Sequence, residues 1–138
     1  MNNPSFPIHG DIRVSVDDRL MIIEGTGPAN IEAVQVYQEN AQRFRDMLNE
    51  GPWASLVLLK GEPLLSPEAK SKLIEIIRYA STQNVIATGV VMQDLPYIKT
   101  IRHFWTSVYE ETTLPYRFFD DEDQARSWLN EQIAAAHK

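Results

Sequence analysis

Residues 55–73 read SLVLLKGEPLLSPEAKSKL, and this stretch decides the fold. The uninterrupted apolar run at 56–59 is typical of a strand that is buried on both faces. A loop with Gly and Pro covers 60–65, and Ser66-Pro67-Glu68 then supplies the residue types that begin a helix. A buried strand followed by a helix indicates an α/β sheet, in which functional surfaces tend to lie beyond the carboxyl ends of the strands.

The rest of the chain alternates strands and helices. The expected strands cover 12–16, 20–24, 54–59, 85–92 and 116–119, and the expected helices cover 31–49, 67–83, 97–110 and a last segment that begins at 120–123. The first two strands, joined by Asp17-Asp18, predict an antiparallel hairpin. The alternation that follows predicts βαβ units with right-handed crossovers. We therefore expect one α/β domain over 10–138, with a mainly parallel sheet of about five strands, an N-terminal antiparallel hairpin and about four helices, preceded by a flexible tail over 1–9.

Composition narrows the class of partner. The 138 residues carry a formal net charge of −6, which argues against a nucleic acid or an anionic membrane, because binding phosphates requires a basic patch. The absence of cysteine excludes thiolate metal sites and cysteine nucleophiles. No signal peptide and no apolar run long enough to span a bilayer is visible, so we expect a cytoplasmic protein.

Motifs for catalysis or cofactor binding are weak. Gly25-x-Gly27 follows a strand, but Asn30 replaces the third glycine of a dinucleotide fingerprint, so a strand-to-helix turn is the better interpretation. The histidines are scattered without the spacing of metal ligands. The acidic run at 120–123 falls at a helix start, where carboxylates stabilise the helix dipole. We predict no catalytic residue, no cofactor and no metal site, and an enzyme of unknown reaction is the last alternative.

The expected helix over 97–110 has an unusually wide apolar arc. Its members are Tyr97, Ile98, Ile101, Phe104, Trp105, Val108 and Tyr109. We favour a core role for this arc, because aromatic stripes on helices are usually buried. Its excess width also fits a partner surface, a homodimer surface or the wall of an apolar pocket. Arg102 borders the arc and could meet an anionic head group or a carboxylate of a partner.

The C-terminal segment FFDDEDQARSWL, residues 118–129, combines an aromatic strand end, an acidic turn and Ala-x-x-Trp-Leu. With this segment and its order of elements, the chain resembles the SpoIIAA-like family, which is related in fold to STAS domains, over about residues 10–133. The resemblance implies a bacterial protein with a STAS-like fold and no assigned activity. It also implies a binding module, since STAS relatives act as switchable binding modules and some relatives by fold bind lipids.

The resemblance also gives Ser66 a possible role. In anti-sigma-factor antagonists, a serine at the start of the helix after the central strand is phosphorylated by a partner kinase. Ser66 matches that position, although this chain has Leu65-Ser66-Pro67-Glu68 in place of Asp-Ser-Ser-Gly-Leu. From the residues alone, Ser66 with Pro67 is a complete helix start and needs no further role. A helix cap is the favoured interpretation, and a regulatory serine stays open.

We therefore expect a non-enzymatic cytoplasmic binding or regulatory module, with Ser66 as the candidate phosphosite and a kinase or another regulator as the protein partner. The surface for that partner would include Gly61, Glu62 and Leu65 of the loop.

The alternative function is a carrier of a lipid or another apolar ligand. It predicts a cavity lined by residues such as Ile101, Phe104 and Trp105, and Tyr97 and Arg102 complete the candidate partner or ligand surface.

Overall fold

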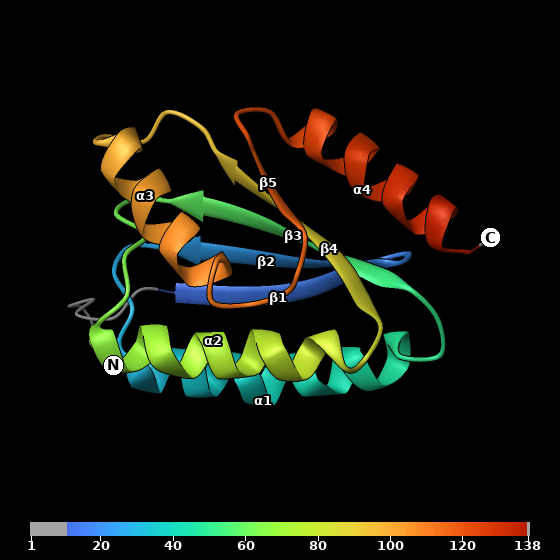
Figure 1. Cartoon of the computed structure of the whole chain (residues 1–138). Coiled ribbons are helices and arrows are strands. Elements are labelled where there is room, and N and C mark those ends of the chain that lie inside the picture. The colour runs from blue at the N-terminus through green and yellow to red at the C-terminus, as the bar shows by residue number, and fades with distance from the viewer. Residues whose placement is uncertain (1–10, 138) are drawn as a thin grey trace, which may run out of the picture.

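A computed structural model describes residues 11–137, so the tail predicted over 1–9 lies outside the described residues. The elements alternate as the sequence predicted (Figure 1). In chain order they are β1 (Asp11–Asp17), β2 (Leu20–Thr26), α1 (Ile31–Leu48), β3 (Trp53–Lys60), α2 (Pro67–Ser81), β4 (Val85–Met92), α3 (Ile98–Tyr109), β5 (Tyr116–Phe119) and α4 (Glu122–Ala136).

The five strands form one sheet in the order β1-β2-β3-β4-β5. β1 pairs with β2 in antiparallel fashion, and the other pairs are parallel. The predicted fold class is therefore confirmed. Because each parallel crossover moves one strand in the same direction, right-handed connections place α1, α2 and α3 on one face of the sheet. We call this the three-helix face, and the opposite one, which α4 covers, the α4 face (Figure 1).

Side-chain alternation explains how the strands divide the core. Ile12, Val14 and Val16 of β1 pack toward the three-helix face, and the residues between them are exposed. β3 lies in the middle of the sheet and is buried on both sides, with Leu56 on the α4 face and Leu59 on the three-helix face. The apolar run at 56–59 thus belongs to the central strand of the sheet.

Side-chain caps begin three of the four helices. The Oδ1 atom of Asn30 accepts a hydrogen bond from the Ala33 N–H at 3.1 Å. The Ser66 Oγ accepts from the Ala69 N–H at 3.2 Å, and Pro67 follows at the first helical position. Asp121 caps α4 in the same way. These contacts confirm the helix starts that the sequence predicted at Asn30, at Ser66 and in the acidic run.

α3 begins without such a cap, and here one prediction was wrong. Tyr97 does not belong to the apolar arc of the helix, because it precedes α3 in a left-handed conformation with φ of 55° and is 77% exposed. A residue with that backbone does not continue the helical register. Ile101, Trp105, Val108 and Tyr109 are buried, so the arc is mostly core. No helix within residues 11–137 is both long enough and apolar enough to cross a bilayer.

Candidate functional site

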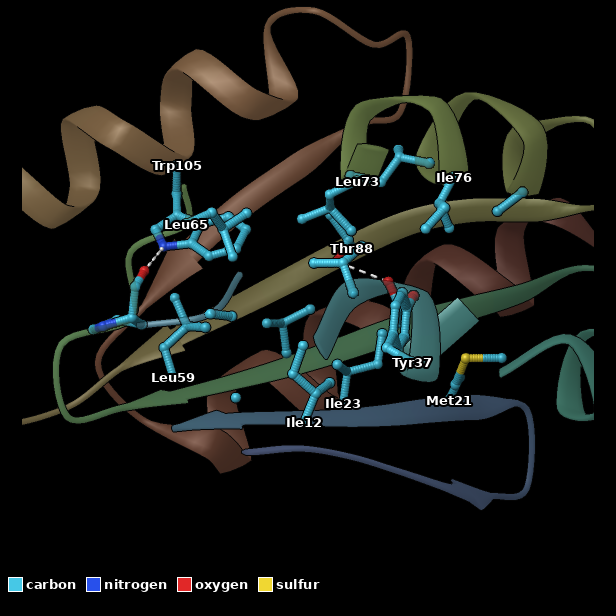
Figure 2. A pocket seen from close by; sticks show the side chains of 18 of the residues that line it. Ile12, Met21, Ile23, Tyr37, Leu59, Leu65, Leu73, Ile76, Thr88 and Trp105 are labelled. Atoms are coloured by element: carbon cyan, nitrogen blue, oxygen red, sulfur yellow. Dashed lines mark hydrogen bonds between the residues drawn. The ribbon is translucent and has the colours of Figure 1, made fainter. Parts of the chain in front are cut away.

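A cavity of about 90 Å³ lies between the sheet and the helices of the three-helix face (Figure 2). It runs along the sheet, from residues at the amino ends of the strands to the loops at their carboxyl ends. Most of its lining is aliphatic or aromatic, with contributions from each of the three helices: Tyr37 of α1, Leu73 and Ile76 of α2, and Trp105 of α3. The cavity is therefore a mainly apolar site between the sheet and these helices.

The loop at 61–66 closes the cavity at the carboxyl ends of the strands. Its backbone is joined to the turn before α1, since the Ala29 N–H donates to the Leu64 carbonyl at 2.9 Å and the Ser66 N–H donates to the Ala29 carbonyl at 3.1 Å. The Trp105 Nε1–H donates to the Pro63 carbonyl at 2.8 Å (Figure 2). Pro63 and Leu65 also line the cavity. The same loop therefore forms part of the cavity wall, and Ser66 is its last residue.

Gly61 allows this loop to fold back on its neighbour. Its φ is +71°, and a Cβ at this position would lie 3.0 Å from the backbone nitrogen of Gly27. Both the left-handed backbone and the close approach require glycine. We expected a strand-to-helix turn over Gly25-x-Gly27, but Gly25 still belongs to β2, which continues to Thr26, so the turn to α1 begins at Gly27. Both glycines line the cavity.

A small polar cluster interrupts the apolar lining. Ser55 and Thr88 stand side by side on β3 and β4, and the Ser55 Oγ donates to the Thr88 Oγ1 at 2.8 Å. Burial raises the pKa of Tyr109 above its ordinary value, against the opposing effect of a hydrogen bond with Thr88. Burial likewise raises the pKa of Tyr37, and both the positive charge of Arg45 and a hydrogen bond from that residue oppose this shift. Both phenols are therefore neutral near pH 7.

Arg45 is the charged residue among those that line the cavity. It projects from the last turn of α1, and its side chain is 1% exposed. Its Nη1 donates to the Gln42 Oε1 at 3.1 Å, whereas its Nη2 is buried and has no hydrogen-bond partner among the described residues. Gln42 in turn donates to the exposed Asp46, so that carboxylate is engaged by the amide.

The environment of Arg45 does not compensate its charge. The C-terminal end of a helix favours a cation by up to about 2 kcal/mol. The Tyr37 ring centroid lies 6.0 Å from the guanidinium carbon and adds a modest cation–π attraction. Burying an ion costs several kcal/mol, and arginine does not give up its proton to escape that cost. The cavity wall thus holds a positive charge that is poorly satisfied by the described residues.

The structure brings some of the predicted site residues together. Gly61, Glu62, Leu65 and Ser66 all lie on the loop that closes the cavity. Trp105 is joined to this loop through Pro63 and lines the cavity, as the ligand-carrier alternative predicted.

Other predicted residues lie elsewhere. Ile101 and Phe104 belong to the core but do not line the cavity, which corrects their predicted role as wall residues. Of the α3 arc, Trp105 and Tyr109 are the residues that line the space. Tyr97 is exposed before α3. Arg102 is exposed, and its guanidinium carbon lies 5.4 Å from the Phe118 ring centroid.

The most informative residue was not predicted. The buried stripe of α1 consists of Val34, Tyr37, Ala41, Arg45 and Leu48. They are spaced by three or four positions, so Arg45 falls on an otherwise apolar face, and this is the signal by which the sequence marks it. Within residues 11–137, no group of three or more His, Asp or Glu side chains is placed to hold a metal ion.

Comparisons with known proteins bear on the fold. No family model matches the chain, and no curated protein matches it significantly. Among solved structures, an uncharacterised protein of the DUF3478 family with a SpoIIAA-like fold, from Shewanella loihica PV-4, is similar with a TM-score of 0.60. The match covers 93% of this chain and 99% of that chain at 14% sequence identity. The chain therefore has a SpoIIAA-like fold, as its resemblance to that family predicted.

Proposed function

We propose that this protein is a non-enzymatic binding module that holds a small apolar ligand in the cavity of the three-helix face. The observation that carries the proposal is the cavity itself, about 90 Å³ of space with a mainly apolar lining. Space of this size next to apolar side chains forfeits packing contacts, and a ligand would restore them. Ligand sites in proteins are commonly of this kind, with a few polar groups that fix orientation.

The titratable groups of the cavity favour binding over catalysis. A general acid or base works best when its pKa lies near the working pH. The titratable side chains that line the cavity are Tyr37, Tyr109 and Arg45, and burial raises the pKa of both tyrosines further from neutrality. They supply hydrogen bonds and charge, which suits a receptor or carrier. We place this module in the cytoplasm on the sequence grounds given above.

Two tryptophans make the proposal testable by fluorescence. Trp53 and Trp105 both line the cavity, so we expect the neutral probe 1-hexanol to change the emission and to raise the melting temperature as it saturates. Val57→Phe fills the space from β3 and should weaken binding, whereas Val36→Phe on the exposed side of α1 should leave it unchanged. Absence of any saturable change with 1-hexanol in the wild-type protein would contradict the proposal.

A second candidate function is a phosphorylation switch at Ser66, whose protein partner is a kinase or another regulator. The observation that favours it is the position of Ser66, at the N-terminus of α2 and on the loop that walls the cavity. A phosphate there would meet backbone N–H groups and the positive end of the helix dipole. Exposed Gly61 and Glu62 beside it offer a surface for the partner. Incubation with host extract and ATP, followed by intact mass measurement of wild type and Ser66→Ala, tests it, and equal phosphate gain by both would exclude Ser66.

A further inference from the structure

We propose that the ligand of the cavity is a small unbranched monocarboxylate, whose carboxylate binds the guanidinium of Arg45 and whose apolar chain lies along the sheet. This inference rests on the proposed function, because it names the chemical class of ligand for the same cavity. The carboxylate would supply the counter-charge that the fold lacks, and the chain would fill the apolar part of the space.

The need for an anion follows from Arg45. Its side chain is 1% exposed, and its Nη2 has no hydrogen-bond partner within the described residues. The ion pairs found over residues 11–137 do not include Arg45. Residues 1–10 contain no Asp or Glu, so their side chains offer no counter-charge either. A buried arginine in an apolar wall that has no counter-charge among the described residues favours a bound anion.

The lining favours a carboxylate over a more highly charged anion. A guanidinium presents parallel N–H groups that match the two oxygens of a carboxylate. Arg45 is the charged residue of the lining, so a monoanion is neutralised there, whereas a phosphate dianion would keep an excess negative charge in an apolar space. The neutral hydroxyls of Tyr37 and Thr88 are also in the wall and can donate to an oxygen that does not face Arg45.

The dimensions favour a short unbranched chain. The cavity volume of about 90 Å³ is several times the roughly 10–15 Å³ that one water molecule needs, so the cavity can take a small molecule of several non-hydrogen atoms. Arg45 stands in the last turn of α1, roughly 20 Å along the helix axis from its start beside the closing loop, at 1.5 Å per residue. The lining extends between these ends, from Trp53 to Pro63. A space of this small volume, with lining residues at both ends of the strands, suits a short alkyl chain better than a bulky ring.

The test is to titrate hexanoate, 1-hexanol and hexylamine into the full chain by calorimetry and tryptophan fluorescence. These probes share one carbon chain and differ in charge. We expect hexanoate to bind about 30-fold or more tightly than 1-hexanol, and hexylamine to bind more weakly than either, because a buried charge pair contributes strongly to affinity. Arg45→Gln should abolish the preference for hexanoate, and Arg43→Gln, an exposed arginine of the same helix, should keep it.

Each outcome decides a different claim. If 1-hexanol binds and hexanoate binds no better, the carboxylate inference is wrong and the proposed apolar site stands. If neither binds, both fail. If sodium chloride at the same concentration gives the same calorimetric and fluorescence signal as hexanoate, the site takes an inorganic anion and the inference is overturned. Should Arg45→Gln fold poorly, Arg45→Met provides the second variant, and retention of the hexanoate preference in that variant would also overturn the inference.

Discussion

The two faces of the sheet are built differently. The buried cluster of the α4 face is apolar throughout and relies on small residues, such as Ala54, Ala87 and Ala125, to bring α4 close to the strands. A Cβ placed on Gly89 would lie 3.3 Å from the Leu129 side chain, so little space is left there. The three-helix face contains larger side chains, a cavity of about 90 Å³ and a buried arginine.

The proposed binding site and the closely packed core therefore lie on opposite faces of the sheet. The side chains on the α4 face are closely packed, and close packing is what makes a core stabilising. The three-helix face leaves space and charge unsatisfied among the described residues, and a fold keeps such features most readily where a ligand completes them. The comparison predicts that equivalent substitutions on the two faces have unequal effects.

The largest expected difference comes from two leucines of β3. Leu56→Ala on the α4 face should lower the free energy of unfolding by about 4 kcal/mol, because it opens a new cavity in a packed cluster. Leu59→Ala on the three-helix face should cost only about 2 kcal/mol, since that side chain already borders the cavity and its truncation enlarges an existing space. Urea unfolding of both variants measures the difference, and equal losses would remove the contrast between the faces.

A smaller effect of opposite sign is expected at Arg45. Arg45→Met keeps the length of the side chain and removes its buried charge, so it should raise the free energy of unfolding by about 2 kcal/mol in the absence of ligand. Arg43→Met on the same helix is the control, and we expect a change within about 0.5 kcal/mol because Arg43 is exposed. Thermal melts of dialysed protein check both. A destabilised Arg45→Met would mean that the arginine is a structural residue.

The sequence predicted the scaffold better than the site, and the reason is the range of the interactions involved. Strand β4 matched its predicted bounds because an apolar run and its flanking turns are local signals. The cap at Ser66 was predicted for the same reason. Tyr97 was misassigned because apolar periodicity does not reveal a left-handed residue before a helix.

The site itself depends on packing across the chain. The Ser55–Thr88 contact joins residues that are 33 positions apart, and only the register of β3 against β4 brings them together. Arg45 carried a sequence signal, a charge on an apolar stripe, but a cavity beside it arises from the way three helices pack on one sheet. Neither the spacing of residues in the sequence nor its composition reveals a cavity that forms only when the elements pack together.

The buried tyrosine of α3 should make the three-helix face sensitive to alkali. Burial raises the pKa of Tyr109 above its unfolded value, so its contribution is fully present below about pH 10 and is lost as the pH rises further. We expect the free energy of unfolding to fall by about 1.4 kcal/mol per pH unit above that point on account of this group. Tyr109→Phe should reduce the slope, whereas Tyr79→Phe at an exposed site of α2 should not. Urea unfolding between pH 9 and 11 measures the slope of the free energy of unfolding against pH. An unchanged slope in Tyr109→Phe would contradict the assignment of this pH dependence to Tyr109.

The smallest expected effect tests whether Ser66 does more than begin α2. Ser66→Ala removes the acceptor of the Ala69 N–H and should cost about 1 kcal/mol of stability, whereas Ser71→Ala on the exposed side of the same helix should be nearly neutral. Ser66→Asp keeps a good cap and adds a negative charge to the loop that closes the cavity. If this loop couples a switch to the cavity, Ser66→Asp alters hexanoate affinity while stability stays close to wild type. Unchanged affinity, together with the loss in Ser66→Ala, would leave Ser66 as a helix cap, because a charge on the loop that closes the cavity would then have no effect on what the cavity binds.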